Sequence, residues 1–318
     1  MPIACDVFER LRVVSVPLGG TQICWKLRDG FVAQGPFYFY VETAPSGSTE
    51  WTPINDEPLV DICCATDTYQ RYYDQLSYIY YRVRLVLPTV PDANTGLPTE
   101  YVSQPQQGNG TWSRRDWLIS RDIIRREYLV QRKRHNITSG GYLLKRRRWG
   151  TPCPLCLDYD TGGTTQSQSC TTCFGTGFVG GYFPAIDYRF TFEALPQRRI
   201  ERNEQVGQVN PIVKQARGVC YPHVDSHDIY ARTDTGERYV IQNVSNLAEY
   251  GGVPLVIRAE LRLAPVTDIL YTVLLDPVRT TVLVRPDGSS IPFPEDGSPG
   301  DPKTVSTQKS GVVENGEW

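Results

Sequence analysis

Four cysteines in two closely spaced pairs limit how the centre of this chain can fold. Cys153 and Cys156 form the first pair and Cys170 and Cys173 the second, in the spacing C-x2-C-x13-C-x2-C. Each pair can present two thiolates from one tight turn, and two such turns together build a tetrahedral site that suits zinc. Four thiolates leave no coordination position for water, so we expect a structural zinc ion. Two disulfides, or reactive thiols, are the alternatives.

The residues around the pairs fit a metal-dependent fold. Gly175 and Gly177 follow the second pair, where their backbone freedom lets amide groups approach the sulfurs. The loop LDYDTGGTTQSQS between the pairs is polar, and metal binding, worth on the order of 10 kcal/mol in small zinc peptides, would hold it in place. The second pair with its glycines resembles the C-x-x-C-x-G-x-G unit of DnaJ-type chaperones. The first pair lacks these glycines and the chain has no His-Pro-Asp, so only the local geometry carries over.

The rest of the chain has the composition of a β-rich protein. It is 40% hydrophobic with 19 Tyr and 24 Pro, in short alternating runs that favour strands over helices. The N-terminus MPIACDVFERLR carries charges where a signal peptide needs an apolar core. No apolar run approaches the roughly 20 residues of a membrane span. We therefore expect synthesis in the cytosol, where paired cysteines more often bind metal than form disulfides, and no association with membranes.

These patterns predict a mainly β, multidomain chain. Strands are expected at Leu11–Pro17, Gln22–Leu27, Phe37–Thr43, Leu59–Ala65 and Tyr78–Leu87. This region resembles an immunoglobulin-like or fibronectin type III sandwich through Trp25, Phe39 with Val41, Trp51 and the strand containing Tyr81 and Val83. The expected organisation is a sandwich at 1–88, a linker at 89–112, a basic helix with the zinc-binding segment at 113–183, a small antiparallel β domain at 184–275, and an extended C-terminal arm at 276–318.

A helix is predicted between Ser113 and Arg134. Ser113 and Asp116 form a capping box, and the sequence then continues without Gly or Pro. From Arg114 to Arg148 the chain has twelve Lys or Arg and three acidic residues, which suits docking against an acidic protein or non-specific contact with DNA. A solvated helix face and a charged loop are the alternative. The predicted basic contact surface consists of Arg114, Arg115, Arg121, Arg125, Arg126, Lys145, Arg146, Arg147 and Arg148.

The C-terminal third returns to strand patterns. Two apolar runs flank Asp234-Thr235-Gly236, a hairpin signal, and 255–263 alternates apolar and charged residues. These features predict a small antiparallel barrel or sandwich. Beyond Pro286 the sequence is polar and rich in turn residues, as expected for an arm that becomes ordered along a neighbouring subunit.

Other candidate sites carry weaker signals. Cys220, His223 and His227 could surround a second metal, although loop histidines at the surface are the simpler interpretation. Cys63 and Cys64 are interpreted as small buried hydrophobes, and whether Cys5, Cys24, Cys63 or Cys64 form disulfides is open. The chain has no G-x-S-x-G, Walker loop or H-E-x-x-H motif. We expect neither enzymatic activity nor a small-molecule substrate.

The central region also carries a family resemblance. After the basic helix come GGYLLKRRRWGTPCPLCLDYDTG, then CTTCFGTGFVGGYFPAIDY, then DIYARTDTGERYVIQNV. This order resembles virion structural proteins of the neck or tail assembly of tailed bacteriophages with contractile tails, over about residues 113–275. The resemblance implies a protein assembled in the bacterial cytoplasm that becomes part of the virion.

The resemblance implies a structural role. The expected function is a homo-oligomeric ring at the head-to-tail junction (neck, collar or connector), in contact with neighbouring neck and tail proteins. A tail or baseplate component is the alternative within the virion. An adhesive, host-receptor-binding protein that uses the N-terminal sandwich is a second class. A zinc-ribbon protein that binds nucleic acid is a third, although no recognition helix or RNA-binding aromatic signature supports it.

Overall fold

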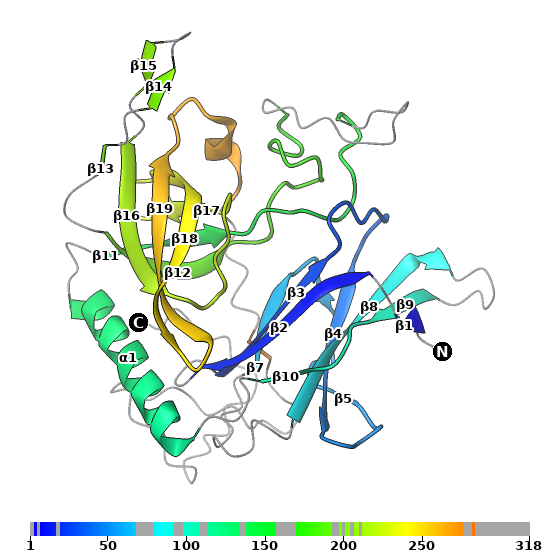
Figure 1. Cartoon of the computed structure of the whole chain (residues 1–318). Helices are drawn as coiled ribbons and strands as arrows, with labels where there is room; N and C mark the ends of the chain where they lie inside the picture. The colour runs from blue at the N-terminus through cyan, green and yellow to red at the C-terminus, as the bar shows by residue number, and fades with distance from the viewer. Residues whose placement is uncertain are drawn as a thin grey trace. The chain divides into compact units, whose positions relative to one another are not determined.

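A computed structural model gives the arrangement of the chain (Figure 1). The chain divides into two compact units, and the first comprises Met1–Arg28, Gly35–Arg126 and Thr281–Trp318. The second comprises Asp29–Gln34 and Glu127–Thr280. The structure describes residues 3–4, 7–16, 20–67, 79–91, 98–108, 113–133, 138–156, 170–192, 197–198, 201–203, 207–209, 212–275 and 282–283.

Unit 1 contains two β-sheets. One sheet has the order β2-β3-β7-β20, and the other has β1-β9-β8-β4-β5, with β10 on β8 and β6 on β4. The first sheet consists of β2 (Phe8–Val16), β3 (Gly20–Leu27), β7 (Cys64–Asp67) and β20 (Val282–Leu283). The second consists of β1 (Ile3–Ala4), β4 (Tyr38–Pro45), β5 (Thr52–Pro53), β6 (Leu59–Val60), β8 (Ile79–Pro91), β9 (Pro98–Val102) and β10 (Gln106–Gln107).

Alternating side chains make the two sheets of unit 1 into a sandwich. On β8 the side chains of Tyr81, Val83 and Leu85 are buried, while the intervening arginines lie on the other face. Trp25 of β3 packs on Phe39 of β4 with ring centroids 5.1 Å apart, so side chains of the two sheets meet in one core. Four of the five expected strands are confirmed, and Trp25 is buried. The expected strand Leu59–Ala65 is wrong: the chain turns at Asp61, which has φ +51°, and forms two short strands, β6 and β7, in different sheets.

The stretch expected as a linker, 89–112, contributes strands. Strand β8 continues to Pro91, and β9 and β10 both pair with it. The Val83 amide donates to the Ser103 hydroxyl at 2.9 Å, and the Thr99 hydroxyl donates to the Val90 carbonyl at 2.7 Å. Strands β9 and β10 are held by backbone and hydroxyl hydrogen bonds, so they need few apolar residues. The Pro and Gln content of this stretch therefore did not predict strands.

The one α-helix of the described residues, α1 (Arg114–Lys133), has the predicted cap. The Ser113 amide donates to the Asp116 carboxylate at 3.0 Å, and the Asp116 amide donates to the Ser113 hydroxyl at 3.2 Å. The helix continues from unit 1 into unit 2 between Arg126 and Glu127. In unit 2 the buried Glu127 carboxylate accepts from the Arg217 guanidinium at 3.0 Å. The end of the helix is thus tied to strand β16 (Ile212–Val219).

Unit 2 contains a closed barrel of six antiparallel strands in the order β12-β11-β17-β18-β19-β16, closed by pairing of β12 with β16. Besides β16, the barrel strands are β11 (Thr138–Leu144), β12 (Ile186–Phe192), β17 (Ile229–Arg232), β18 (Arg238–Tyr250) and β19 (Val253–Leu263). A two-residue strand, β13 (Gln197–Arg198), adds to β16, and β14 (Glu201–Asn203) pairs with β15 (Gly207–Val209). The barrel alternative of the sequence prediction is the one observed.

The barrel begins earlier than the expected boundary at 184. Strand β11 precedes the cysteine segment, which is therefore an insertion between two barrel strands. The sequence of β11, TSGGYLL, did not predict a core strand, and Gly141 shows why. A Cβ atom at Gly141 would lie 2.4 Å from the Ala231 carbonyl oxygen and 2.6 Å from the Tyr230 ring. Aromatic rings fill this space, since Phe190 and Tyr230 stack edge to face at 4.9 Å.

After the barrel, a short 3-10 helix, η2 (Ile269–Thr272), returns to pack beside it. Leu270 packs in one core cluster with Leu144 and Ile229. The buried Arg238 guanidinium donates to the backbone carbonyls of Leu270 and Val273. Of the expected arm at 276–318, only Val282–Leu283 lies within the described residues, where it pairs in parallel with β7 of the same chain.

Candidate metal centre

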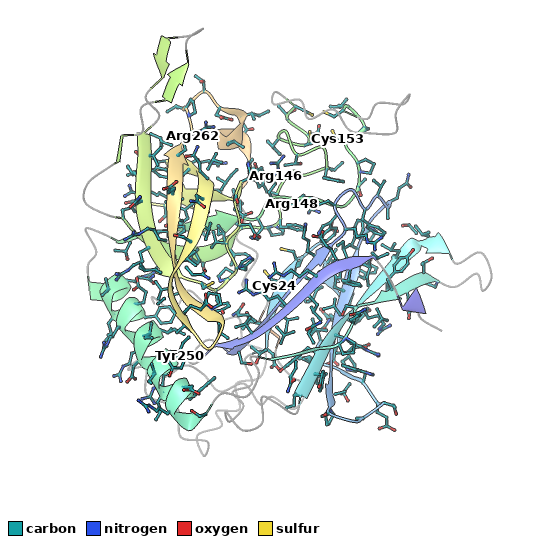
Figure 2. The ribbon with its side chains drawn as sticks, in the orientation of Figure 1. Cys24, Arg146, Arg148, Cys153, Tyr250 and Arg262 are labelled. Carbon is teal, nitrogen blue, oxygen red and sulfur yellow. The ribbon has the colours of Figure 1, made fainter. Side chains whose placement is uncertain are left out.

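The two cysteine pairs come together into one cluster of four thiols. The sulfur atoms of Cys153, Cys156, Cys170 and Cys173 all lie within 4.8 Å of one another. The Sγ atoms of Cys153 and Cys170 are 3.8 Å apart, and those of Cys156 and Cys173 are 3.6 Å apart. No disulfide joins any of the cysteines in the described residues. The predicted tetrathiol site is therefore present as a geometric unit. Cys153 is labelled in Figure 2.

The first pair lies on a tight turn that is fastened to the second pair. Within the turn, the Cys156 amide donates to the Cys153 carbonyl at 3.1 Å. The Cys153 amide donates to the Gly177 carbonyl at 2.9 Å, and Pro152 forms a β-bridge with Phe178. Leu155 at the tip of the turn is 74% exposed. These backbone hydrogen bonds thus fix the turn that carries both sulfurs of the first pair.

The second pair depends on residues in left-handed backbone conformations. The Phe174 amide donates to the Cys170 carbonyl at 2.8 Å, and the Thr176 amide donates to the Cys173 carbonyl at 2.9 Å. Phe174 has φ +49°, Gly175 +77° and Gly177 +85°, values at which glycine carries no steric penalty. The glycines that the sequence singled out therefore bend the chain so that the carbonyls of the pair are satisfied.

The electrostatics of the four thiols favour a bound cation. The backbone amides of Cys173 and Thr172 donate to the Cys170 sulfur and lower the pKa of Cys170 to about 6. Burial raises the pKa of Cys153, and burial followed by hydrogen bonds to Cys170 and Cys173 raises that of Cys156 to about 12. Four adjacent sulfurs cannot all ionise without a compensating charge, and a divalent metal supplies that charge.

The donor set fits a closed structural metal site. Cys153, Cys156 and Cys173 are buried and Cys170 is partly buried. Four sulfur donors in two tight turns match a tetrahedral ion that prefers thiolate, and they leave no open position for substrate. The arrangement can cross-link the polypeptide, and it does not present a reactive metal.

The two ends of the inserted segment pair with each other between β11 and β12. The Arg147 amide donates to the Gly181 carbonyl at 3.0 Å, and the Phe183 amide donates to the Lys145 carbonyl at 2.8 Å. A Cβ atom at Gly181 would lie 2.6 Å from the Cys173 carbonyl oxygen. The chain entering the segment therefore pairs with the chain leaving it, and the second cysteine turn packs directly on this stem.

Lys145 was predicted to belong to the basic contact surface, but the structure buries it. It is 8% exposed, and its ammonium donates to the Asp228 carboxylate at 2.6 Å and to the Asp225 carboxylate at 2.7 Å. The Arg146 amide also donates to Asp228, at 3.0 Å. This buried network fixes the loop before β17 to the stem of the cysteine segment. No local sequence pattern indicates this network, because the partners are about eighty positions apart.

The three arginines after Lys145 are partly buried, and two of them, Arg146 and Arg147, contact the cysteine segment. Arg146 donates to the Gly175 carbonyl at 3.4 Å. Arg147 donates to the Tyr182 carbonyl at 3.2 Å and lies over the Phe183 ring at 4.7 Å. Arg146 and Arg148 are marked in Figure 2. The Arg146 and Arg147 side chains therefore support the segment, and all three arginines expose only part of their surface.

The helical arginines are more accessible. Arg115, Arg125 and Arg126 are exposed, whereas Arg121 is partly buried and donates to Asp122 at 3.3 Å. The side chain of Arg114 lies outside the described residues. Arg114–Arg126 and Lys145–Arg148 also fall in different units. The structure therefore supports an exposed basic face on the helix, and it removes Lys145 from the predicted surface.

The structure does not assemble a second metal site from Cys220, His223 and His227. In the described part of the chain, the only group of three or more potential ligands within reach of one ion is the four-cysteine cluster. His223 Nε2 pairs instead with Asp225 Oδ1 at 3.0 Å, and Cys220 is buried. The alternative interpretation of these histidines as ordinary loop residues fits better.

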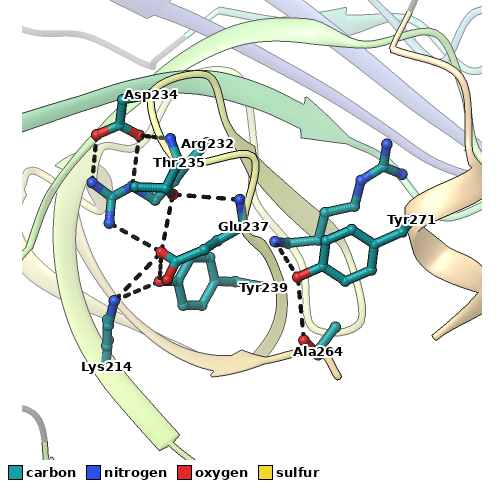
Figure 3. A network of polar contacts seen from close by, with 9 residues as sticks. Lys214, Arg232, Asp234, Thr235, Glu237, Tyr239, Ala264 and Tyr271 are labelled. Carbon is teal, nitrogen blue, oxygen red and sulfur yellow. Dashed lines mark hydrogen bonds and ion pairs between the residues drawn. The ribbon is translucent and has the colours of Figure 1, made fainter. Parts of the chain in front are cut away.

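A second polar network surrounds the predicted hairpin between β17 and β18 (Figure 3). Arg232 forms a two-pronged pair with Asp234, and Glu237 accepts from the Tyr239 hydroxyl at 2.6 Å. Lys214 of β16 donates to the same hydroxyl at 2.6 Å. Burial, then the hydrogen bond to Glu237, raise the pKa of Tyr239. Each charge in this network has an opposite partner, which indicates a role in fixing the hairpin on the barrel.

No protein-family model matches this chain, and no curated protein matches it. Within the described residues, no helix has both the length and the apolar character that crossing a membrane requires.

Proposed function

We propose that the chain is a structural subunit of a tailed-bacteriophage virion, located in a ring at the neck. The proposal rests on the sequence resemblance of residues 113–275. The observation that carries it in the structure is the closed four-thiol cluster, inserted between β11 and β12 and hydrogen-bonded to its own stem. Such a cluster stiffens a polar segment without providing an active site, which is what a particle component needs.

The proposed metal is zinc. Two pairs of thiols on tight turns form a tetrathiolate site, and zinc is a common occupant of such sites. Its proposed role is to cross-link the segment 151–183, whose intervening loop is polar. The ion would thus contribute to the folding free energy of the subunit.

The N-terminal sandwich is proposed to be an immunoglobulin-like or fibronectin type III domain. Strands β2, β3 and β7 form one sheet, and β4, β8 and β9 belong to the other. With β2 counted as the first strand and the short β5 and β6 together as the fourth, the first, second and fifth strands lie opposite the third, sixth and seventh, as in such domains. Domains of this kind serve many adhesive and spacing roles, so the fold assigns no chemistry by itself.

The proposed contact surface toward neighbouring subunits is the exposed face of the first part of α1. Arg115, Leu118 and Arg125 are exposed at positions three and seven residues apart, so they lie on one side of the helix. Leu118 is 37% exposed. A large apolar side chain between arginines suits a protein partner with an acidic rim, and the same arginines allow non-specific contact with DNA.

The experiment that tests the proposal locates the protein in the particle. Antibody raised against the purified chain is applied to intact virions and imaged by electron microscopy, while the purified chain is examined for rings. Label at the head-to-tail junction together with ring formation supports the proposal. Label at the baseplate or at the distal tip would replace it with the tail or receptor-binding alternative. No label on virions, together with nucleic-acid binding that persists at physiological salt, would favour the nucleic-acid-binding alternative.

A further inference from the structure

A second group of cysteines lies in the sandwich of unit 1. Cys24 of β3 and Cys64 of β7 are directly opposite each other in the antiparallel ladder. Cys63 precedes Cys64 in the chain, and both are buried, while Cys24 is partly exposed. Nothing in the proposed function uses these thiols.

Residues that lie opposite each other in an antiparallel ladder alternate between a wider and a closer Cα separation, and Cys24 and Cys64 have the closer one. The Trp25 amide donates to the Cys63 carbonyl at 3.0 Å, which makes Trp25 and Cys63 a hydrogen-bonded pair. Pairs alternate along an antiparallel ladder, so Cys24 and Cys64 form a non-hydrogen-bonded pair, whose Cα atoms are typically about 4.5 Å apart. Disulfides span Cα separations of roughly 4.4–6.8 Å. This backbone therefore needs little movement to accept a disulfide.

The sulfur atoms also face each other. The pKa of the Cys64 thiol is raised well above its usual value, first by a hydrogen bond with the Cys24 thiol, then by one with Cys63 and by burial. Cys63, Cys64 and Cys24 do not form a metal site, because the four-cysteine cluster is the sole such group among the described residues. Two facing thiols in a strand ladder can undergo thiol–disulfide exchange.

We propose that Cys24 and Cys64 form a cross-strand disulfide when the protein meets a small-molecule disulfide such as oxidised glutathione. This inference is independent of the proposed function. The consequence is a covalent link between the central strand β3 and the neighbouring strand β7. The link closes a loop of about forty residues, and it restricts the unfolded chain of unit 1.

The reaction is a balanced thiol–disulfide exchange. The partly exposed Cys24 thiolate attacks one sulfur of the oxidised glutathione, forms a mixed disulfide and releases one glutathione thiolate. The Cys64 thiol then gives up its proton to solvent, attacks the Cys24 sulfur, forms the cross-strand bond and releases the second glutathione thiolate. The two cysteines together lose two electrons and two protons, and the glutathione disulfide is reduced to two thiols.

The test is peptide mapping of the full chain loaded with zinc, before and after incubation with oxidised glutathione. Remaining thiols are alkylated under denaturing conditions and the chain is cut with trypsin. Cys24 then lies in the peptide Val13–Lys26, and Cys63 and Cys64 lie together in Asp29–Arg71. The expected product is a pair of these two peptides joined by a disulfide, with a mass two hydrogens below their sum. Electrophoresis without reductant should show that the link lies within one chain and does not join two chains. The melting temperature of unit 1 should rise by on the order of 10 °C.

Single serine variants identify the sulfur atoms. Cys63→Ser should retain the linked peptides, whereas Cys24→Ser and Cys64→Ser should both lose them. The wild-type map is decisive even if a variant fails to fold. The inference is overturned if the wild-type chain forms no link between these peptides, or if the link connects two chains. It is also overturned if Cys63 takes the place of Cys64, either by keeping the link in Cys64→Ser or by joining Cys64 itself.

Discussion

The chain contains two groups of neighbouring cysteines, and they differ in how the backbone presents them. In unit 2, two tight turns direct four sulfurs toward a common centre, all within 4.8 Å of one another. In unit 1, a regular antiparallel ladder places Cys24 opposite Cys64. Turns that converge build a polydentate site, whereas a ladder offers thiols in pairs. The same residue type therefore suits a metal in one region and a disulfide in the other.

The largest effect is expected from removing one sulfur of the four-thiol cluster. Cys156→Ser should lower the bound metal from one ion per chain toward none. It should also destabilise unit 2 by several kcal/mol, a large part of the roughly 10 kcal/mol that structural zinc contributes in small peptides. Metal analysis of the dialysed protein and thermal unfolding measure the two effects.

Cys64→Ser is the matched control for that variant, because it removes a buried thiol from the other group. It should leave the metal content unchanged. Equal loss of metal in both variants would contradict the distinction between the two cysteine groups.

The next largest effect concerns the anchor between the cysteine segment and the barrel. Lys145→Met leaves the buried Asp228 carboxylate without its cation and should cost about 3–5 kcal/mol of unfolding free energy. Adding Asp228→Asn should restore part of that loss, because the uncompensated charge is removed. Denaturant unfolding gives both values. Loss of bound metal from the folded Lys145→Met protein would show that the thiol cluster depends on the anchor and not only on its own turns.

Two adjacent glycines beside the second cysteine turn allow the cost of backbone strain to be measured apart from that of steric contact. Gly180 has φ +80° and Gly181 has φ +65°, so both lie in the left-handed region. At Gly180 a Cβ atom would meet only the Arg147 side chain, at 3.7 Å. Gly180→Ala should cost about 1–2 kcal/mol from the left-handed backbone alone. Gly181→Ala should cost more and weaken metal binding, because its Cβ would meet the Cys173 carbonyl. Similar losses of stability and of zinc affinity in the two variants would argue against a tightly packed cysteine turn.

The smallest effect is a pH dependence at Asp225. Burial opposes ionisation of this carboxyl, but hydrogen bonds from His223 and Lys145 outweigh it and hold its pKa below the usual range. A carboxyl with a lowered folded pKa stabilises the protein above its unfolded pKa, near 4, and loses this contribution as the pH falls. Asp225→Asn should therefore be less stable by on the order of 1 kcal/mol at pH 7, with the difference shrinking below about pH 4. A difference that does not change with pH would contradict the ionised pairing.

The sequence predicted the parts of the fold that depend on local patterns. The spacing of Cys153 to Cys173 predicted the thiol cluster, and the alternation around Val83 predicted β8. It did not predict β11, because Gly141 carries no side chain where the Tyr230 ring approaches. It placed Lys145 on the surface, because its carboxylate partners come from a distant loop. The sequence also did not predict that Cys24 lies opposite Cys64, since this depends on the register of two strands forty positions apart.

X-ray absorption at the zinc edge, combined with metal analysis of the purified chain, tests most directly whether four thiolates hold one structural ion. The account predicts one zinc per chain, surrounded by four sulfur atoms at about 2.3 Å. A chain whose stability does not change when the metal is removed, a coordination shell containing nitrogen or oxygen, or disulfides among Cys153, Cys156, Cys170 and Cys173 would contradict it.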